Sequence, residues 1–358
     1  MKYALVGCGR VSPNHIKAAV ENGFSILAVC DIDFSHIDDM FERAVECGKE
    51  NIRRYADFIE MYEKEKPELV SIALPSGLHA KAAIEAIKRG INVIIEKPMA
   101  MSIEDADEII RLSKEMGVKV SACHQNRFNI AVQEMRTALE KGRFGQLSNA
   151  AITVRWDRGK GYYDQADWRG KFESDGGTLM NQCIHGIDLL IWMCGGDLKR
   201  VFGITKRQYH PYIEAEDVGT AVFEFGNGVV ATVEGTVNVP GGSLEEHLTL
   251  IGSGGVVKLG GKSANAIDVW RFTDDPSDSK DGFHEKTVNV YGNGHTSLFA
   301  DVADAIKENR EPYVNAAAGK KALEAILAIY KSSKTKMPVE LPLENLAGKD
   351  FEGMFDND

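Results

Sequence analysis

The chain has 358 residues, of which 44% are hydrophobic and 27% are charged, and its formal net charge is -11 at pH 7. This length allows a large core and favours two domains over one. The acidic balance argues against a nucleic-acid partner, because nucleic-acid binding depends on an excess of Lys and Arg, although a local Arg cluster could still hold an anionic substrate.

The first third of the chain alternates short apolar runs with amphipathic helical stretches. Strands are predicted at residues 3–6, 26–30, 69–74, 93–95 and 118–122. Helices are predicted up to about residue 22, at 80–89 and at 103–116. Strands and helices that alternate at these lengths indicate a doubly wound parallel sheet with helices on both faces. We assign this first domain to residues 1–123.

After residue 123 the pattern becomes typical of an antiparallel sheet. Strands at 218–225 and 229–237 flank Gly226-Asn227-Gly228, residues that tolerate the positive φ of hairpin turns. Two more short strands flank the Gly-rich turn at 252–255 in the same way. The remaining predicted elements are a strand at 147–156, helices at 130–141, 179–194, 297–308 and 319–334, and a solvated acidic loop at 274–281. Residues 124–358 are therefore expected to form an α+β domain with a large, mostly antiparallel open sheet.

Several features of the sequence concern the surroundings of the protein. The six cysteines form no C-x-x-C pair and no metal-ligand spacing, so they indicate reduced thiols and no metal site. We see no secretion signal, and no apolar run reaches the roughly 20 residues of a membrane span. These observations predict a cytoplasmic protein without a membrane partner. One face of the open sheet would need a cover, which predicts a homo-oligomer, a dimer or a tetramer, formed through the second domain.

Gly7 and Gly9 lie between the first predicted strand and the first helix, where the pyrophosphate of a dinucleotide would rest. Gly7 permits a tight turn, and Gly9 lets the backbone approach the phosphates at the helix N-terminus, with Arg10 and Val11 continuing the loop. Asp31 ends the second strand, where an acidic side chain accepts hydrogen bonds from the adenosine ribose and repels a 2′-phosphate. The sequence therefore predicts a Rossmann domain that binds NAD rather than NADP.

Two side chains from different domains could carry the proton chemistry of a dehydrogenase. Lys97 follows the strand at 93–95, at the sheet edge where ligands of doubly wound folds bind. A lysine beside the positive charge of oxidised nicotinamide should have a lowered pKa, which suits proton transfer. His185 lies near the start of the predicted helix at 179–194 and shares one helix face with Asn181. Its imidazole could take a proton from a hydroxyl as hydride leaves the same carbon.

A set of ordered motifs covers nearly the whole chain. They are Gly7-x-Gly9 with His15, Pro75-Ser76-Gly77-Leu78-His79, Glu96-Lys97-Pro98, and Gly176-Gly177 followed by His185 and Asp188. Together they resemble the glucose-fructose oxidoreductase / inositol dehydrogenase (Gfo/Idh/MocA) family. Further stretches are His124-Gln125-Asn126-Arg127, Tyr162-Tyr163-Asp164, Trp168-Arg169-Gly170, Met180-Asn181-Gln182 and Tyr291-Gly292-x-Gly294-His295-Thr296. These are similar to bacterial nucleotide-sugar dehydrogenases of surface-polysaccharide biosynthesis, which oxidise the 3-hydroxyl of a UDP-linked N-acetylhexosamine or its uronic acid.

This resemblance implies roles for the matching positions. Lys97 and His185, with Asn181, would form the catalytic group. NAD would be bound by Gly7, Gly9, Arg10, Val11, Asp31, Leu74, Ser76, His79, Glu96, Lys97, Gln125, Trp168 and Arg169. The sugar would be bound by Lys97, Arg127, Tyr163, Asn181, His185 and His295.

Some assignments stay open at this point. Many family members carry Asp where this chain has Asn181, so His185 lacks a carboxylate to raise its basicity, and either Lys97 or His185 could be the main base. Arg155 and Arg158 are candidate partners for the phosphates of a UDP-sugar. The alternative substrates are a free polyol or aldose, and a third reading is a non-catalytic ligand sensor. The presence of both Lys97 and His185 argues against the sensor.

Overall fold

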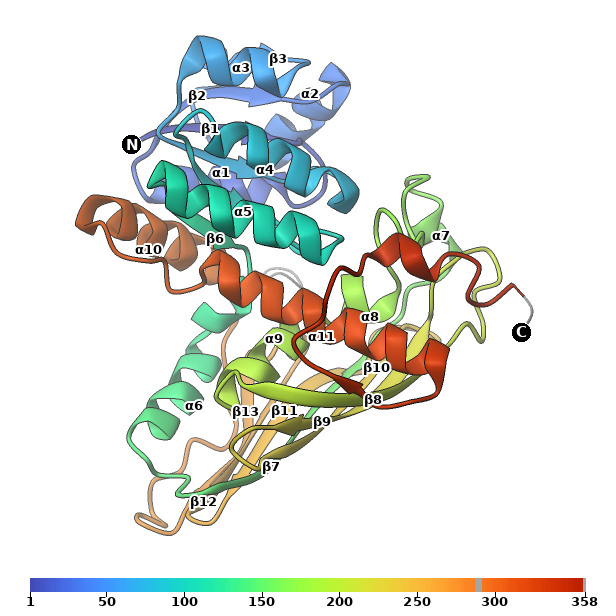
Figure 1. Ribbon diagram of the computed structural model, residues 1–358. Coiled ribbons are helices and arrows are strands. Elements are labelled where there is room, and N and C mark those ends of the chain that lie inside the picture. Colours follow the sequence, from blue (N-terminus) through green and yellow to red (C-terminus); the bar gives the residue numbers. More distant parts are fainter. Residues whose placement is uncertain (287–291, 357–358) are drawn as a thin grey trace. The chain divides into compact units, whose positions relative to one another are not determined.

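The computed structural model describes residues 1–286 and 292–356, which divide into two compact units. The first unit consists of Met1–His124 and Gly294–Lys320, and the second of Gln125–Asn293 and Lys321–Asp358 (Figure 1). The chain therefore returns to the first unit after residue 293. The division into two domains at residue 123, expected from the sequence, does not include this return. Tyr291, part of one sequence motif, lies outside the described residues.

A six-stranded parallel sheet forms the centre of the first unit, in the order β3-β2-β1-β4-β5-β6. Its strands are β1 (Lys2–Val6), β2 (Ser25–Cys30), β3 (Arg53–Tyr55), β4 (Leu69–Ile72), β5 (Asn92–Ile95) and β6 (Val120–Ala122). Its helices are α1 (Ser12–Glu21), α2 (Phe34–Arg43), η1 (Lys49–Asn51), α3 (Phe58–Glu65), η2 (Ser76–Leu78), α4 (His79–Ile87), α5 (Ile103–Met116) and α10 (Gly294–Glu308). The strand order reverses between β1 and β4, and ligands of doubly wound sheets bind outside the carboxyl ends of strands at such a point. The predicted doubly wound parallel sheet is confirmed, and β3, α2 and α3 add to it.

Residues 294–320 complete the first unit. The ring of Phe299 in α10 packs against Tyr3 of β1, with centroids 5.8 Å apart. Farther along, the N–H of Ala122 donates to the carbonyl oxygen of Val314 at 3.1 Å, which adds a partner to the end of β6. The first unit thus takes part of its core and part of its sheet edge from a segment near the end of the chain.

The second unit contains a nine-stranded sheet in the order β14-β13-β12-β11-β7-β10-β9-β8-β15. Its strands are β7 (Leu147–Arg155), β8 (Leu198–Lys206), β9 (Val218–Phe225), β10 (Val230–Thr236), β11 (Glu245–Gly252), β12 (Gly255–Gly260), β13 (Ala266–Phe272), β14 (Phe283–His284) and β15 (Val339–Glu340). Both predicted hairpins are present, as β9–β10 and β11–β12. The pair β7–β10 is parallel, and the other pairs are antiparallel. The predicted mostly antiparallel sheet is confirmed.

Helices pack against one face of this sheet. Apart from α10, the described helical segments after β6 are η3 (Gln125–Phe128), α6 (Ile130–Glu140), α7 (Lys160–Tyr163), α8 (Thr178–Asn181), α9 (Ile184–Met193), α11 (Ala316–Thr335) and η4 (Gly348–Phe351). A Cβ at Gly186 of α9 would lie only 2.7 Å from Ile152 of β7, so the helix rests directly on the strand. Across the described parts of the chain, no helix combines the length and apolar character that a membrane crossing requires.

The prediction of one continuous helix at 179–194 is wrong. The N–H of Cys183 donates to the carbonyl oxygen of Thr178, five positions back, at 2.9 Å. α8 ends at this wider turn, and α9 begins after it. Asn181 and His185 therefore belong to two short helices and do not share one helix face.

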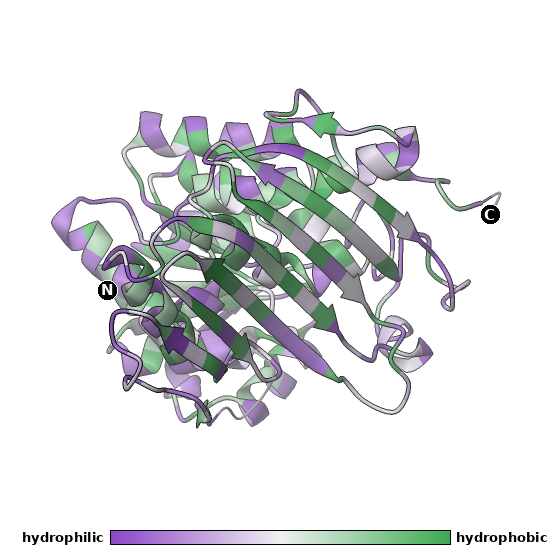
Figure 2. Cartoon of the chain, turned by 90° about the horizontal axis from the view of Figure 1, so that it is seen from below, coloured by the Kyte–Doolittle hydropathy of each residue, from purple (hydrophilic) through white to green (hydrophobic). Residues whose placement is uncertain are grey.

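The opposite face of the nine-stranded sheet carries exposed apolar side chains among charged ones. The apolar members are Phe202, Ile204, Val222, Val230 and Ile251. Ion pairs such as Arg155–Glu234 and Arg200–Glu224 lie on the same strands. Figure 2 shows the strands with hydrophobic and hydrophilic segments interspersed along them. This surface combines apolar area with paired charges.

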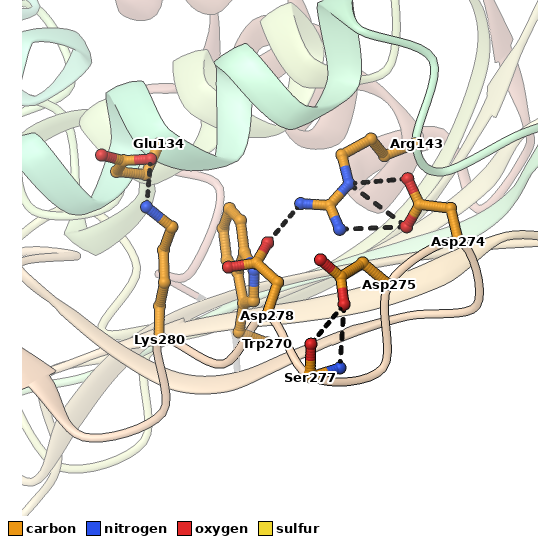
Figure 3. Close-up of polar contacts among 8 residues, drawn as sticks. All are labelled: Glu134, Arg143, Trp270, Asp274, Asp275, Ser277, Asp278 and Lys280. Atoms are coloured by element: carbon orange, nitrogen blue, oxygen red, sulfur yellow. Dashed lines mark hydrogen bonds and ion pairs between the residues drawn. The ribbon is translucent and has the colours of Figure 1, made fainter.

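The acidic loop at 274–281 is exposed, as predicted, but it is also anchored by ion pairs (Figure 3). Arg143, which follows α6, pairs with Asp274 at 2.9 Å and with Asp278 at 2.5 Å. Asp278 also accepts the indole N–H of Trp270 at 3.1 Å. The loop is thus tied both to the segment after α6 and to β13.

Candidate active site

The loop between β1 and α1 has the backbone that a dinucleotide pyrophosphate requires. Gly7 has a φ of +92°, and a Cβ there would lie 2.4 Å from the carbonyl oxygen of Ala73, so a side chain does not fit. At Gly9 a Cβ would meet nothing within 4 Å. Arg10 and Val11 lead from this open space into α1. The residues present therefore fit the phosphates of NAD, which need a close and unobstructed approach to the backbone.

Alanine substitutions of these two glycines should separate folding from cofactor binding. Gly7→Ala should give little folded protein, because the backbone at Ala73 cannot move away from the new methyl group. Gly9→Ala should fold with a near wild-type Tm but bind NADH about tenfold or more weakly, because its methyl occupies the approach to the phosphates. Thermal unfolding and titration of NADH fluorescence measure the two effects. Unchanged NADH affinity in Gly9→Ala would contradict this placement of the pyrophosphate.

Asp31 follows β2, and its carboxylate lies beside the glycine loop. Oδ2 accepts the N–H of Cys8 at 2.9 Å, while Oδ1 accepts the N–H of Asp33 at 3.0 Å and lies 3.1 Å from Nδ1 of His36. This position suits the predicted hydrogen bonds to the adenosine ribose. The bond to Cys8 shows that Asp31 also holds the glycine loop, which the sequence pattern does not reveal.

The segment after β4 contains three predicted cofactor residues, namely Leu74, Ser76 and His79. His79 is buried; its Nδ1 lies 2.7 Å from the carbonyl oxygen of Pro98, and its Nε2 lies 2.8 Å from that of Leu74. Burial lowers the pKa of His79. The imidazole therefore connects the end of β4 to the turn after β5. Ser76, which lies between Leu74 and His79 in the sequence, is also buried.

Lys97 follows β5 directly after the buried residue Glu96. Oε2 of Glu96 accepts the backbone N–H of Lys97 at 3.2 Å. Oε1 accepts Nε2–H of His15 at 2.9 Å, and Nε2 of His295 lies 3.6 Å from the same oxygen. Burial alone would raise the pKa of Glu96, but its bonds with His15 and His295 hold that pKa well below its usual range. An ionised carboxylate held by α1 and α10 therefore fixes the backbone of Lys97.

Cys123 completes a buried group with His15, Glu96 and His295, whose donor atoms lie within 4.8 Å of one another. A metal-bound imidazole almost always donates its second N–H to an acceptor. Nδ1 of His15 has no partner among the described residues, and its Nε2 is at hydrogen-bond distance from Glu96. We therefore interpret the group as a hydrogen-bonded network of the first unit. The predicted contact of His295 with the sugar stays a prediction.

Asn181, at the end of α8, belongs to a polar network of the second unit. Its Nδ2 donates to Oδ1 of the buried Asp175, and its Oδ1 lies 3.5 Å from the hydroxyl of Tyr162. Nη1 of Arg169 donates to the same hydroxyl at 2.6 Å, and its guanidinium stacks on Trp168. The structure thus brings a predicted sugar ligand, Asn181, together with two predicted cofactor ligands, Trp168 and Arg169.

Other predicted ligands of the second unit have firm protein partners. Arg127 is buried, donates to Asp188 at 2.7 and 2.6 Å, and stacks on Trp192. Arg155, a candidate for phosphate binding, instead binds Glu234 and Glu245 through all three of its guanidinium nitrogens. Arg155 is therefore a structural partner of two carboxylates on the sheet. Gln125 is buried at the start of η3, and its contact with NAD stays a prediction.

Tyr163 and His185 are the predicted ligands whose surroundings suit a polar substrate. Tyr163 is buried beside Tyr162, burial raises the pKa of its hydroxyl, and that hydroxyl has no partner among the described residues. His185 lies in the first turn of α9 and is 9% exposed. A sugar hydroxyl could form a hydrogen bond with the hydroxyl of Tyr163, and the imidazole of His185 could exchange a proton with a sugar hydroxyl.

The sequence pattern does not single out two buried carboxylates near Asn181. One is Asp175, and the other is Glu216, which accepts the N–H of Leu179 at 2.8 Å and the hydroxyl hydrogen of Tyr330 at 3.0 Å. Burial raises the pKa of Glu216 to about 8. The nearest signal in the sequence is the glycine pair at 176–177: the chain packs closely against Glu216 at Gly177 and against Met180 at Gly176.

Comparisons with known proteins agree with this architecture. The family model described as "Oxidoreductase family, NAD-binding Rossmann fold" matches residues 1–124, and "Oxidoreductase family, C-terminal alpha/beta domain" matches residues 136–341. WlbA dehydrogenase from Bordetella pertussis, solved in complex with NADH and UDP-GlcNAcA, is 32% identical. The alignment covers 96% of this chain and 98% of that chain, with a TM-score of 0.84.

Two curated relatives have lower identity. Myo-inositol 2-dehydrogenase from Thermotoga maritima is 23% identical over 345 residues, which cover 95% of this chain and 98% of that enzyme. The 2,7-anhydro-N-acetylneuraminate hydratase from Mediterraneibacter gnavus is 27% identical over 265 residues, and the match spans 72% of this chain but just under two thirds, 66%, of the hydratase. With both halves matched by models of one family, the chain belongs to the Gfo/Idh/MocA oxidoreductase family, and its first unit contains the NAD-binding Rossmann fold.

Proposed function

We propose that this protein is an NAD-dependent dehydrogenase that oxidises the C3 hydroxyl of a UDP-linked N-acetylated sugar or of its uronic acid. The observation that carries the proposal is the similarity, over 96% of the chain, to a dehydrogenase solved with NADH and UDP-GlcNAcA. The protein would then act in the cytoplasm, in the biosynthesis of a surface polysaccharide.

Two side chains support the proton half of this chemistry. When bound, NAD supplies the hydride acceptor. Lys97, whose backbone Glu96 fixes, and His185, in the first turn of α9, are the groups that would take the hydroxyl proton as the same carbon loses hydride and becomes a ketone. Asn181 and Tyr163 would hold the sugar by hydrogen bonds.

A free polyol or aldose is the second candidate substrate. The similarity to myo-inositol 2-dehydrogenase favours it, because that match covers 95% of the chain. The UDP-sugar is favoured over it by the higher identity to WlbA. A non-catalytic sensor would have no need for both Lys97 and His185.

A substrate panel tests the proposed function. Enzyme loaded with NAD should form NADH when mixed with UDP-GlcNAcA or UDP-N-acetylglucosamine, with a kcat/KM about 100-fold or more above that for N-acetylglucosamine or myo-inositol. The difference arises because binding energy from the nucleotide is used to lower the barrier at the reacting carbon. Single-turnover absorbance of NADH reports the chemistry even if NADH leaves slowly. A preference for myo-inositol would establish the second candidate, and no NADH with any sugar would contradict a dehydrogenase.

We further propose that a second copy of the chain covers the exposed sheet face of the second unit. Its apolar side chains, among them Phe202, Ile204 and Val222, would lose contact with water in such an assembly. The paired charges on the same face would lie at the rim or form contacts between copies. This arrangement supports the predicted dimer or tetramer.

A further inference from the structure

We propose that Asp175 is a positioning residue that fixes the amide orientation of Asn181, so that Asn181 presents its carbonyl oxygen, a hydrogen-bond acceptor, to the sugar. The inference rests on the proposed function in one respect, namely that Asn181 contacts the substrate. The contacts that orient the amide all lie within the second unit.

The first orienting contact comes from the carboxylate. Asp175 is 1% exposed; its Oδ2 accepts the N–H of Gly170 at 2.7 Å, and its Oδ1 accepts Nδ2–H of Asn181. Both oxygens of Asp175 are therefore used as acceptors, and Asn181 turns its NH₂ group, and not its oxygen, toward Asp175.

The second contact dictates the same orientation from the other side of the amide. The hydroxyl of Tyr162 accepts hydrogen bonds from Arg169 at 2.6 Å and from Gln182 at 3.3 Å. With two donors directed at its oxygen, Tyr162 uses its own hydrogen to reach Oδ1 of Asn181 at 3.5 Å. The hydrogen bonds thus run in one direction, from Arg169 through Tyr162 and Asn181 to Asp175.

The local backbone holds the carboxylate in place. Gly170 and Gly176, on either side of Asp175, both have a φ of +71°. A Cβ at Gly176 would lie 2.4 Å from Cβ of Met180, so the loop packs directly against α8. Asp175 therefore cannot withdraw from Asn181 without disturbing the helix that carries it.

A buried carboxylate lies directly behind the amide of Asn181, on the side of its NH₂ group. A hydrogen bond to a charged acceptor polarises the amide and makes its carbonyl oxygen a stronger acceptor. Asp175 thus keeps an acceptor site for a sugar hydroxyl without placing a charge next to the substrate.

Exchange of the two side chains provides the test. In Asp175→Asn, the new amide would accept the N–H of Gly170 and direct its NH₂ at Asn181, which must then flip and present a donor to the sugar. In Asn181→Asp, two carboxylates would face each other, so one would be forced to take a proton. In the double variant D175N/N181D, the amide at 175 would donate to a carboxylate at 181, and every contact would be satisfied again.

We expect each single variant to lower kcat/KM for UDP-GlcNAcA by about 10- to 100-fold, as expected for a misdirected hydrogen bond to a charged or strongly polarised group. The double variant should recover to within about threefold of wild type. NADH affinity should be unchanged in all three. Glu214→Gln is the matched control, because Glu214 accepts a backbone N–H, that of Phe172, in the same loop; it should leave kcat/KM unchanged.

The outcomes separate this inference from the proposed function. If Asn181→Ala keeps full activity, Asn181 does not contact the sugar, and the proposed site fails. If Asn181→Ala loses activity but Asp175→Asn does not, the proposed site stands and the positioning role of Asp175 is overturned. Should Asp175→Asn be too unstable to purify, an inactive N181D with an active double variant supports the role, and an inactive double variant overturns it.

Discussion

Lys97→Met should lower kcat by about 100-fold or more and still allow NADH to bind. The reason is that the substitution removes the ammonium group but keeps an unbranched side chain of similar length. The bonds from Glu96 to the backbone N–H of residue 97 and to His15 do not depend on the lysine side chain. Single-turnover formation of NADH and titration of NADH fluorescence measure the two quantities.

Two further variants complete this experiment. Lys81→Met, on the exposed face of α4, removes a charge from the same unit and should keep full activity. His185→Asn should also slow turnover, and whichever of Lys97→Met and His185→Asn shows the larger loss identifies the main base. Turnover at the wild-type rate in both Lys97→Met and His185→Asn would contradict the proposed mechanism.

Glu246→Gln should remove much of the pH dependence of the free energy of unfolding. In the wild-type protein we expect this free energy to fall as pH rises. Glu246 lies on β11; it is 2% exposed, and its Oε1 has no hydrogen-bond partner among the described residues. Burial raises its pKa from 4.5 to about 8. Between these two values the unfolded chain releases the proton while the folded chain keeps it, so the free energy of unfolding falls with rising pH.

The expected size of this effect is on the order of 4 kcal/mol at pH 8, since each unit of pKa difference corresponds to about 1.4 kcal/mol. Gln cannot ionise, so the variant should be more stable than wild type at pH 8 and nearly equal to it at pH 4.5. Some slope should remain in the variant, because Glu216 has a similarly raised pKa. Urea unfolding at several pH values measures the curves.

The adjacent residue on the same strand offers a control. Glu245 binds Arg155 and His247, and its pKa is lowered: burial would raise it, but these bonds outweigh burial. Glu245→Gln should therefore leave the decline between pH 4.5 and 8 in place. A wild-type stability that does not change over this range would contradict the burial of a protonated Glu246.

Five of the six strands of the first unit could be predicted because their signals are local. These strands are short apolar runs, and Gly7, Gly9 and Asp31 follow them at the spacing of a dinucleotide site. In the second unit, the hairpin β9–β10 could be predicted from its Gly-rich turn. Strand β8 could not, because its outward residues include Phe202 and Ile204 while its inward Gly203 leaves room for Ile329 of α11, so apolar and polar positions do not alternate.

Residues of the candidate site could be named from the sequence where the side chain itself suggests a role. They could not be named where the role depends on a partner that is far away in the sequence. Lys97 and His185 could be named from their positions after a strand and near a helix start. The bond between His15 and Glu96 joins residues 81 positions apart, and no spacing rule covers such a pair. At the break after α8, the backbone N–H of Cys183 donates five positions back, to Thr178, and an apolar pattern that continues through the break does not reveal this change.

The return of residues 294–320 to the first unit has a consequence for synthesis on the ribosome. The nucleotide-binding half is synthesised first. However, Tyr3 and the end of β6 cannot form their contacts with Phe299 and Val314 until these later residues have been made. By then β7 to β14 have been made, which is every strand of the nine-stranded sheet except β15. The N-terminal half therefore reaches its final form late in translation, and the maturation of the two halves is linked by the order in which the chain is made.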